Sequence, residues 1–229
     1  MGLGLVGLTL WWWLQSQSLD SIERRSLNAE VIRQRLLEHV ELTLVSTALV
    51  VALAVPLGIL ATRGAARRAR PLILAVGNVG LAVPSIGVLA LFAVGFGIGF
   101  RYVVVALVAY STLPVLRNVV VGLEQVDPAL IEAARGMGLT STRVLLKVEL
   151  PLAVPVMLAG IRTALVFNVG TAALATFAGA GGLGALIDNG IRLNRRPVLI
   201  AGSVLTAVLA LAMDWMGGIV QARLRPKGL

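Results

Sequence analysis

Long apolar runs alternate with short polar segments along this chain. A helix that crosses a membrane needs roughly 20 apolar residues, because it rises about 1.5 Å per residue through a hydrocarbon core of roughly 30 Å. A shorter run at 2–14 ends in three consecutive tryptophans, which are typical of a membrane–water interface, and predicts a short, tilted first span. The longer runs predict five further spans, at 40–62, 71–92, 102–121, 152–177 and 198–220.

The segment between the first two runs, 17–38, is polar but not featureless. Leu27, Val31, Ile32 and Leu36 recur in it at roughly helical spacing. This pattern is typical of an amphipathic helix that lies against a bilayer or against another subunit. We therefore expect residues 1–38 to form a short span followed by an amphipathic segment on the outer side.

Composition agrees with an integral membrane protein. Hydrophobic residues make up 58% of the 229 residues, only 14% are charged, and the mean hydropathy is +0.91. The fold class is therefore all-α, a polytopic helical bundle of about six spans in one domain, 1–229. Zero cysteines and a single histidine exclude disulfides, thiolate metal sites and histidine clusters, so we expect no metal and no catalytic residues in this chain.

The net charge of +9 does not indicate nucleic acid, because the basic residues are scattered in short loops between apolar runs. We expect them to contact the lipid bilayer and to set the topology. Basic loops prefer the cytoplasmic side, and placing the 63–70 turn there also places the 124–151 loop and the 223–227 tail there. Residues 192–196 then carry basic side chains outside, which is an exception to the rule. The prediction is a multi-pass protein of the cytoplasmic (inner) membrane.

The loop 124–151 is polar and charged although membrane-length runs flank it on both sides. Its first part, 128–137, predicts a short amphipathic helix that ends at Gly136 or Gly138, since glycine suits a helix C-terminus. Its second part, 141–149, begins with hydroxyl residues able to cap a helix and should stop at Leu150 and Pro151. We therefore expect two short helices with a bend between them, in water and facing a partner.

This loop resembles the EAA loop of ABC importer permeases. Glu132, Ala133 and Ala134 are followed at the motif's spacing by Gly138 and by Leu150–Pro151. The resemblance implies a type I ABC importer permease fold, in which the loop forms a coupling helix that docks into a groove of an ATP-binding subunit. An ordinary amphipathic loop is the alternative. The residues expected to mediate coupling are Glu132, Ala133, Ala134, Arg135, Met137, Gly138, Arg143, Lys147 and Pro151.

The same resemblance implies the partners. They would be a second permease chain, identical or paralogous, two ATP-binding subunits and an extracytoplasmic substrate-binding protein. The dipeptide Gly-Lys does not occur in the sequence, so there is no phosphate-binding loop of the Walker type. We expect no cofactor on this chain, ATP with Mg²⁺ on the partner subunits, and no enzymatic activity of its own.

The GAGGLG segment matches a dinucleotide-binding pattern, but that pattern requires a strand before it and a helix N-terminus after it. Here it follows a membrane span. A flexible or re-entrant turn is the physical interpretation, and the segment also resembles the osmoprotectant branch of the same permease family. The residues of this candidate gating turn are Gly179, Gly181, Gly182 and Gly184.

Polar groups inside spans are costly in hydrocarbon, so they are candidates for lining the transport pathway. Helix-to-helix hydrogen bonds are the alternative for each of them. Asp214 is expected to pair with Arg223 or a neighbouring chain, and Arg162 to reach the inner headgroups or pair within the bundle. The pathway candidates are Asn78, Pro84, Ser85, Asn168 and Thr171, with Pro84 also expected to kink its helix.

The resemblance favours uptake of a small osmoprotectant such as glycine betaine, choline, carnitine or proline. Methionine or another amino acid is the alternative solute. A secondary transporter would need internal repeats and intramembrane carboxylates, of which Asp214 is the one available, and a membrane scaffold would use the loop for docking alone. Aromatic side chains are few in the spans, so we expect the binding protein to supply most of the selectivity.

Overall fold

The computed structural model describes residues 2–224, and every regular element in that range is helical. Residues 225–229, which hold Arg225 and Lys227 of the basic tail expected inside, lie outside it. Four stretches are long and apolar enough to cross a membrane: α3 (Ala29–Ala61), α6 (Phe100–Glu124), the stretch Ser141–Ala178 built on α9 (Leu150–Ala172), and α11 (Arg196–Leu224). The expected spans at 102–121, 152–177 and 198–220 are confirmed as helices. The predicted total of about six spans is not confirmed.

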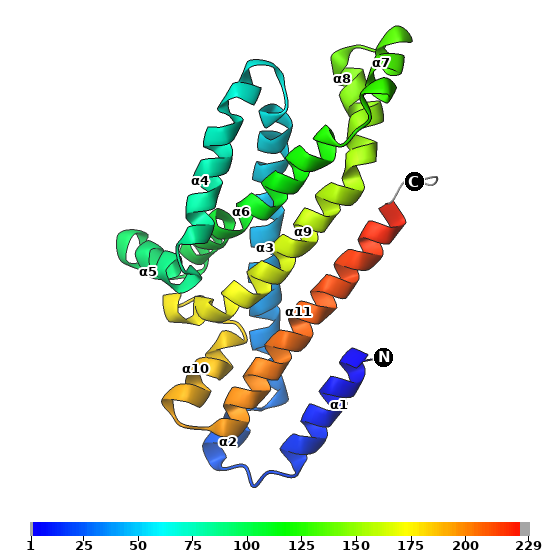
Figure 1. Ribbon diagram of the computed structural model, residues 1–229. Helices are drawn as coiled ribbons and strands as arrows, with labels where there is room; N and C mark the ends of the chain where they lie inside the picture. The colour runs from blue at the N-terminus through cyan, green and yellow to red at the C-terminus, as the bar shows by residue number, and fades with distance from the viewer. Residues whose placement is uncertain (1, 225–229) are drawn as a thin grey trace.

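The first expected span forms α1 (Gly2–Gln15), which packs beside α11 and extends over only part of the molecule's length (Figure 1). Its 14 residues rise about 21 Å, short of the roughly 30 Å hydrocarbon core. It is therefore too short to cross a bilayer of ordinary thickness without local thinning of the bilayer.

The predicted division between an amphipathic helix at 17–38 and a span from residue 40 is wrong. A short helix α2 (Ser21–Ser26) begins at Asp20 with a capping box formed with Glu23, and α3 then runs without interruption from Ala29 to Ala61. The change from polar to apolar residues near position 40 marks a change of surroundings rather than a helix end. The apolar positions of the polar segment pack onto the cluster formed by α9, α10 and α11.

The expected single span at 71–92 is also wrong. It is divided into α4 (Arg70–Ala82) and α5 (Ser85–Phe96), and the two helices meet at a sharp angle (Figure 1). Val83 adopts an extended conformation with ψ 131°, as the residue before a proline tends to, and Pro84 then stands at the N-cap of α5. Pro84 therefore ends one helix and begins another instead of kinking a continuous one.

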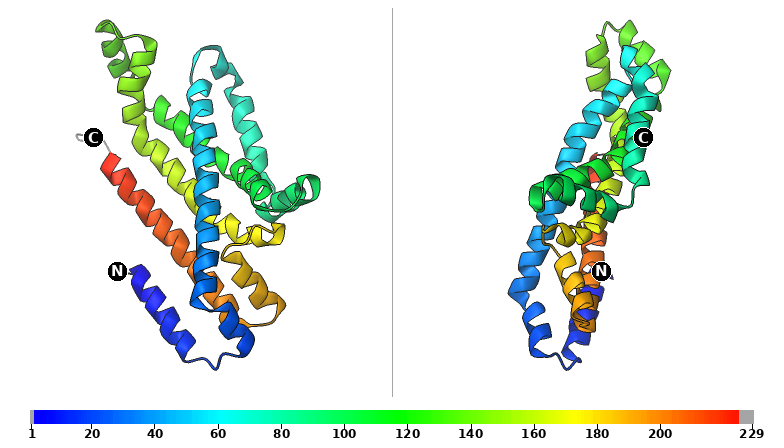
Figure 2. Two further views of the ribbon diagram at one scale, coloured as in Figure 1. Left: turned by 180° about the vertical axis from the view of Figure 1, so that it is seen from behind. Right: turned by 90° about the vertical axis from the view of Figure 1, so that its left-hand side faces the viewer.

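The core of the molecule lies where α6 packs against α9 on one side and α3 on the other. Val50, Val119 and Met157 represent the buried cluster that these three helices share. In Figure 1 α3 runs behind α6, α9 and α11, and the reverse view in Figure 2 brings α3 to the front. The molecule is thus a layer of crossing helices with α3 along one side.

The two ends of the molecule carry different connections. At one end lie the 3-10 turn η1 (Gly64–Ala69) and the helices α7 (Pro128–Gly136) and α8 (Ser141–Val144) (Figure 1). At the opposite end lie α2 and α10 (Gly184–Arg192), the latter a short helix that the sequence pattern did not predict. The 63–70 turn and the 124–151 loop therefore share one end, as the charge pattern requires.

Candidate functional site

The helix α7 has well-formed ends on both sides. The Asp127 side chain accepts a hydrogen bond from the Ala129 N–H at 2.8 Å, and Pro128 occupies the first turn. After the helix, Gly138 has a φ of +84°, a left-handed conformation that glycine adopts without a steric penalty. The predicted helix and the bend at Gly138 are confirmed.

The second half of the loop differs from the prediction. Thr140 provides no side-chain cap, and α8 passes through a π-helical turn, Leu145–Glu149, directly into α9. Pro151 therefore does not stop the helix. It has no N–H to donate to the carbonyl four residues earlier, at Lys147, and the wider π turn lies where that bond is missing.

Most of the expected coupling residues are on the surface. Glu132, Ala133, Arg135, Met137, Gly138, Arg143, Lys147 and Pro151 are exposed. Met137, with 75% of its surface accessible, is the most prominent apolar side chain among them. Ala134 is the exception, because it is buried. An exposed helix that ends in an apolar side chain is suited to insertion into a groove of another protein.

Two ion-pair groups tie this loop to the rest of the bundle, and the sequence analysis missed both. Arg63, just after α3, makes two hydrogen bonds to the carboxylate of Glu149, whose side chain is only 4% exposed. Arg70 pairs with Glu124 at the end of α6, and Arg67 approaches the same carboxylate at 3.9 Å. Glu124 lies at the start of the 124–151 loop and Glu149 near its end. Their opposite charge to the basic 63–70 turn is the feature of the sequence that could have predicted these ion pairs.

These ion pairs surround a cavity of about 620 Å³ that α7 also lines. Pro128 and Ile131 contribute its α7 wall, and Arg63, Arg67, Arg70, Glu124 and Glu149 contribute its charged wall. The arginines of the 63–70 turn therefore contact both helices that lead into and out of the loop. The α7 helix is therefore connected to α3, α6 and α9 through the residues that line this one cavity.

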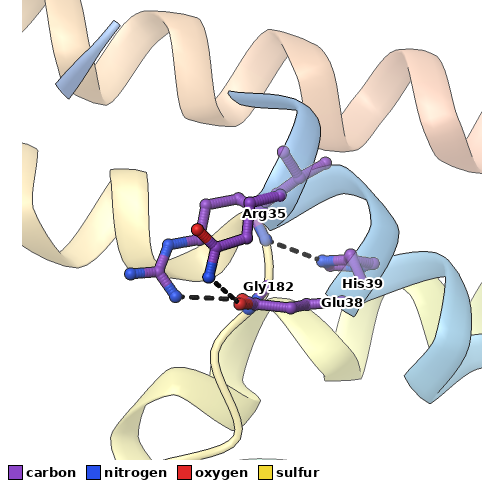
Figure 3. A network of polar contacts seen from close by, with 6 residues as sticks. Arg35, Glu38, His39 and Gly182 are labelled. Carbon is purple, nitrogen blue, oxygen red and sulfur yellow. Dashed lines mark hydrogen bonds and ion pairs between the residues drawn. The ribbon is translucent and has the colours of Figure 1, made fainter. Parts of the chain in front are cut away.

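The candidate gating turn lies toward the end opposite α7 (Figure 1) and is held against α3 (Figure 3). Gly181 and Gly182 have φ values of +75° and +83°. The Gly182 N–H donates to the Glu38 carboxylate at 2.9 Å, and Arg35 and Gln34 donate to the same carboxylate at 2.9 Å. The turn is therefore anchored by a charged group of α3, and α10 follows it directly.

His39 adds a second anchor from the interior. It is fully buried, its Nδ1 accepts from the Leu183 N–H at 3.2 Å, and its Nε2 lies 3.0 Å from the Val169 carbonyl oxygen. Since Nδ1 accepts, the proton sits on Nε2 and donates to Val169. A neutral imidazole thus joins the end of α9 to the start of α10 through α3.

The pathway candidates fall into two groups. Asn168 and Thr171 are buried within this chain, and the Asn168 amide donates to the Thr47 hydroxyl of α3 at 2.8 Å. Asn78 is exposed on α4, where its side-chain oxygen accepts from Arg117 of α6 at 2.6 Å. Pro84 is exposed at the α4–α5 break and Ser85 is half-buried beside it.

Asp214 does not pair with Arg223 as expected. It pairs with Arg162 of α9, with Nη2 and Oδ2 2.5 Å apart and a second contact from Nε. Both side chains keep more than a third of their surface exposed, and they line a cavity of about 510 Å³ between α9 and α11. Arg162 therefore pairs within the bundle, which was one of its two expected placements.

Comparison with known proteins assigns the chain to one family. The family model of the "binding-protein-dependent transport system inner membrane component" matches residues 54–226. The choline transport system permease protein OpuBB of Bacillus subtilis (strain 168) is 38% identical over 192 residues, covering 84% of this chain and 88% of the relative. The osmoprotectant import permease protein OsmY of Salmonella typhimurium is 41% identical over 222 residues, covering 97% of this chain and 91% of the relative.

Solved structures agree with the fold. An inward-facing conformation of the MetNI methionine ABC transporter aligns with a TM-score of 0.75 at 25% identity, over 86% of this chain and 98% of the other. A chain of an amino acid ABC transporter with histidines aligns with a TM-score of 0.72 at 18% identity, over 90% of this chain and 100% of the other. The latter likeness concerns the fold alone.

Proposed function

Since the chain belongs to the family of binding-protein-dependent transport system inner membrane components, we propose that it is the membrane-spanning subunit of an ATP-driven importer and forms half of its translocation pathway. It is a multi-pass protein of the inner membrane. The observation that carries the proposal is the exposed α7 followed by a bend at Gly138, with Glu132, Ala133 and Gly138 at the spacing of the EAA motif.

The solute we propose is a small osmoprotectant such as glycine betaine, choline or carnitine. Relatives that cover most of this chain at 35–41% identity are named as permeases for these compounds or for osmoprotectants in general. The methionine transporter is less similar, at 25% identity, so methionine has the weaker support as the solute.

Coupling to ATP hydrolysis would proceed through α7. In this proposal a separate ATP-binding subunit, which holds ATP and Mg²⁺, receives the exposed residues of α7 and α8 in a surface groove. Arg63, Arg67 and Arg70 would pass the resulting displacement to α3, α6 and α9 through their ion pairs with Glu149 and Glu124. The end that carries α7 therefore faces the cytoplasm.

The complete assembly would contain a second permease chain, two ATP-binding subunits and an extracytoplasmic binding protein. The binding protein would deliver solute at the opposite end, where the glycine turn 179–184 is anchored to α3. Closure of the ATP-binding subunits would draw the two α7 helices together and reorient the pathway between its two openings.

Transport by the reconstituted complex tests this function. The assembly is purified from native membranes and placed in proteoliposomes with ATP inside, binding protein outside, and labelled choline, glycine betaine, carnitine or methionine outside. We expect accumulation of at least one osmoprotectant that requires both ATP and the binding protein. Accumulation without the ATP-binding subunits would identify a secondary transporter, and intact assembly with no uptake of any solute would favour a scaffold.

A further inference from the structure

In α6, α9 and α11, three charged side chains lie well inside the helix. Arg117 precedes the end of α6 by seven residues, Arg162 follows the start of α9 by twelve, and Asp214 precedes the end of α11 by ten. At about 1.5 Å per residue these separations are about 10, 18 and 15 Å. Charges at such depth face protein or water rather than lipid, because their transfer into hydrocarbon is costly.

The two arginines point away from α3. On α6, Val119 packs against Gly58 of α3, and Arg117, two residues earlier, is about 160° away around the helix. On α9, Asn168 bonds to Thr47 of α3, and Arg162 is about 120° away around that helix. In Figure 1, α6, α9 and α11 lie in front of α3.

The exposed side of α3 has the opposite character. From Leu44 onward its exposed large side chains are apolar, and they are Leu44, Val45, Leu49, Leu53 and Leu60. Such a surface suits lipid tails. The charged side chains of α6, α9 and α11 at membrane depth are therefore on the side of these helices that faces away from α3.

The charges on that side do not balance. Arg162 is neutralised by Asp214, but Arg117 donates to the neutral amide of Asn78 and has no carboxylate within 4.0 Å in the part of the chain that the structure describes. Close contact of Gly77 with Leu113 holds α4 against α6 at this level and places Asn78 beside Arg117. The side thus presents one uncompensated guanidinium that an anionic group can neutralise.

An aromatic pair accompanies this arginine. Tyr110 precedes Arg117 by seven residues, two helical turns, so both lie on the same side of α6. Its ring meets that of Phe167 of α9 edge to face, with centroids 6.3 Å apart, and Phe167 also lines the 510 Å³ cavity beside Asp214. The faces of such rings attract quaternary ammonium groups.

We propose that Asn78, Tyr110, Arg117 and Phe167 form a solute-binding surface at membrane depth for small zwitterions that combine a carboxylate with a quaternary ammonium. Arg117, oriented by Asn78, binds the carboxylate, and Tyr110 with Phe167 binds the cationic end. The inference rests on the proposed function and names the part of this chain that contacts the solute. It excludes Asn168 from that contact, because its side chain is enclosed against α3.

A pair of solutes tests the role of Arg117, since glycine betaine carries a carboxylate and choline does not. We expect Arg117→Gln to raise the KM for glycine betaine uptake by about tenfold, the loss expected from one charge-assisted contact, and to change the KM for choline little. Arg117→Lys should restore part of the loss. Arg101→Gln, at the exposed start of the same helix, is the matched control and should change neither KM. An unchanged ratio of the two KM values in Arg117→Gln would overturn the proposal while leaving the transport function intact.

A second experiment does not depend on which solute is transported. The chain contains no cysteine, so single cysteines report their own accessibility. Val121→Cys, one turn from Arg117 and 41% exposed, is compared with Leu53→Cys on the apolar side of α3, 46% exposed. In the assembled complex in open membranes, a charged thiol reagent should label position 121 and not position 53, and glycine betaine should slow the labelling. If position 121 is as unreactive as position 53, or if glycine betaine gives no protection, the surface does not bind solute.

Discussion

Arg63 holds Glu149 in a two-point ion pair, although 86 residues separate them in the sequence. Arg63 lies two residues after the end of α3, between α3 and η1. Glu149 is the last residue of the π turn that connects α8 to α9. The Glu149 side chain is almost completely buried, so its charge depends on this one partner. The pair therefore connects the start of the membrane-entering helix to the longest helix of the bundle.

Glu149→Gln should weaken this connection. The substitution keeps the shape of the side chain but removes a charged hydrogen-bond acceptor, which costs about 2 kcal/mol. We expect a lower Tm of the assembled complex and a lower ratio of solute transported to ATP hydrolysed. Glu30→Gln removes an exposed pair with Arg33 and should change neither quantity. An unaltered ratio in Glu149→Gln would show that the pair does not take part in coupling.

Gly138→Ala should uncouple the loop without a steric clash. No atom lies within 4 Å of a side chain added at Gly138, so the effect would come from its φ of +84°, which costs a residue with a Cβ about 1 kcal/mol. The bend after α7 should shift, and ATP hydrolysis should continue with reduced uptake. Gly136→Ala is the matched control, since Gly136 also has open space around it but lies within α7 at negative φ. Equal uptake by both variants would contradict a role for the bend.

The first helix and the bend of the 124–151 loop were predictable because their signals are local. Pro128, the alternating exposed and apolar positions of α7, and Gly138 each act within a few residues, so their spacing determines a helix and a bend. The continuous helix through Pro151 was not predictable from the same rules. It depends on a π turn and on the burial of Glu149 against Arg63, which are properties of the packed molecule.

The same distinction holds in the spans. Length and hydropathy identified α6, α9 and α11, but they do not report where a helix turns, as the break at Val83–Pro84 shows. Likewise Asn168 and Asn78 are equally polar in the sequence. One is buried against Thr47 and the other is exposed beside Arg117, because they face different neighbours. Arg117 was not among the predicted residues, because its place beside Asn78 depends on the packing of α4 against α6.

His39→Phe should release the glycine turn from α3. The substitution fills a similar space but leaves the Leu183 N–H and the Val169 carbonyl without their partner, at a cost of about 1–3 kcal/mol for each buried group. We expect faster hydrogen exchange at residues 182–185 and a lower Tm of the complex. Gln34→Ala removes only one exposed donor to Glu38 and serves as the control. Unchanged exchange in His39→Phe would mean that Glu38 alone anchors the turn.

Arg223→Gln and Arg162→Gln distinguish the two possible partners of Asp214. The carboxylate bonds to Arg162 at two points, so removing Arg162 leaves a negative charge at membrane depth with no partner, whereas removing Arg223 leaves the pair intact. We therefore expect Arg162→Gln to reduce the amount of assembled complex in the membrane and Arg223→Gln to leave it unchanged. Arg162→Gln combined with Asp214→Asn should recover much of the lost assembly, because the double variant buries no unpaired charge. Complex yield after affinity purification, normalised to total chain in the membrane, measures all three variants. If the double variant is as poor as Arg162→Gln alone, the defect comes from lost packing of the arginine stem along α11 rather than from the stranded carboxylate.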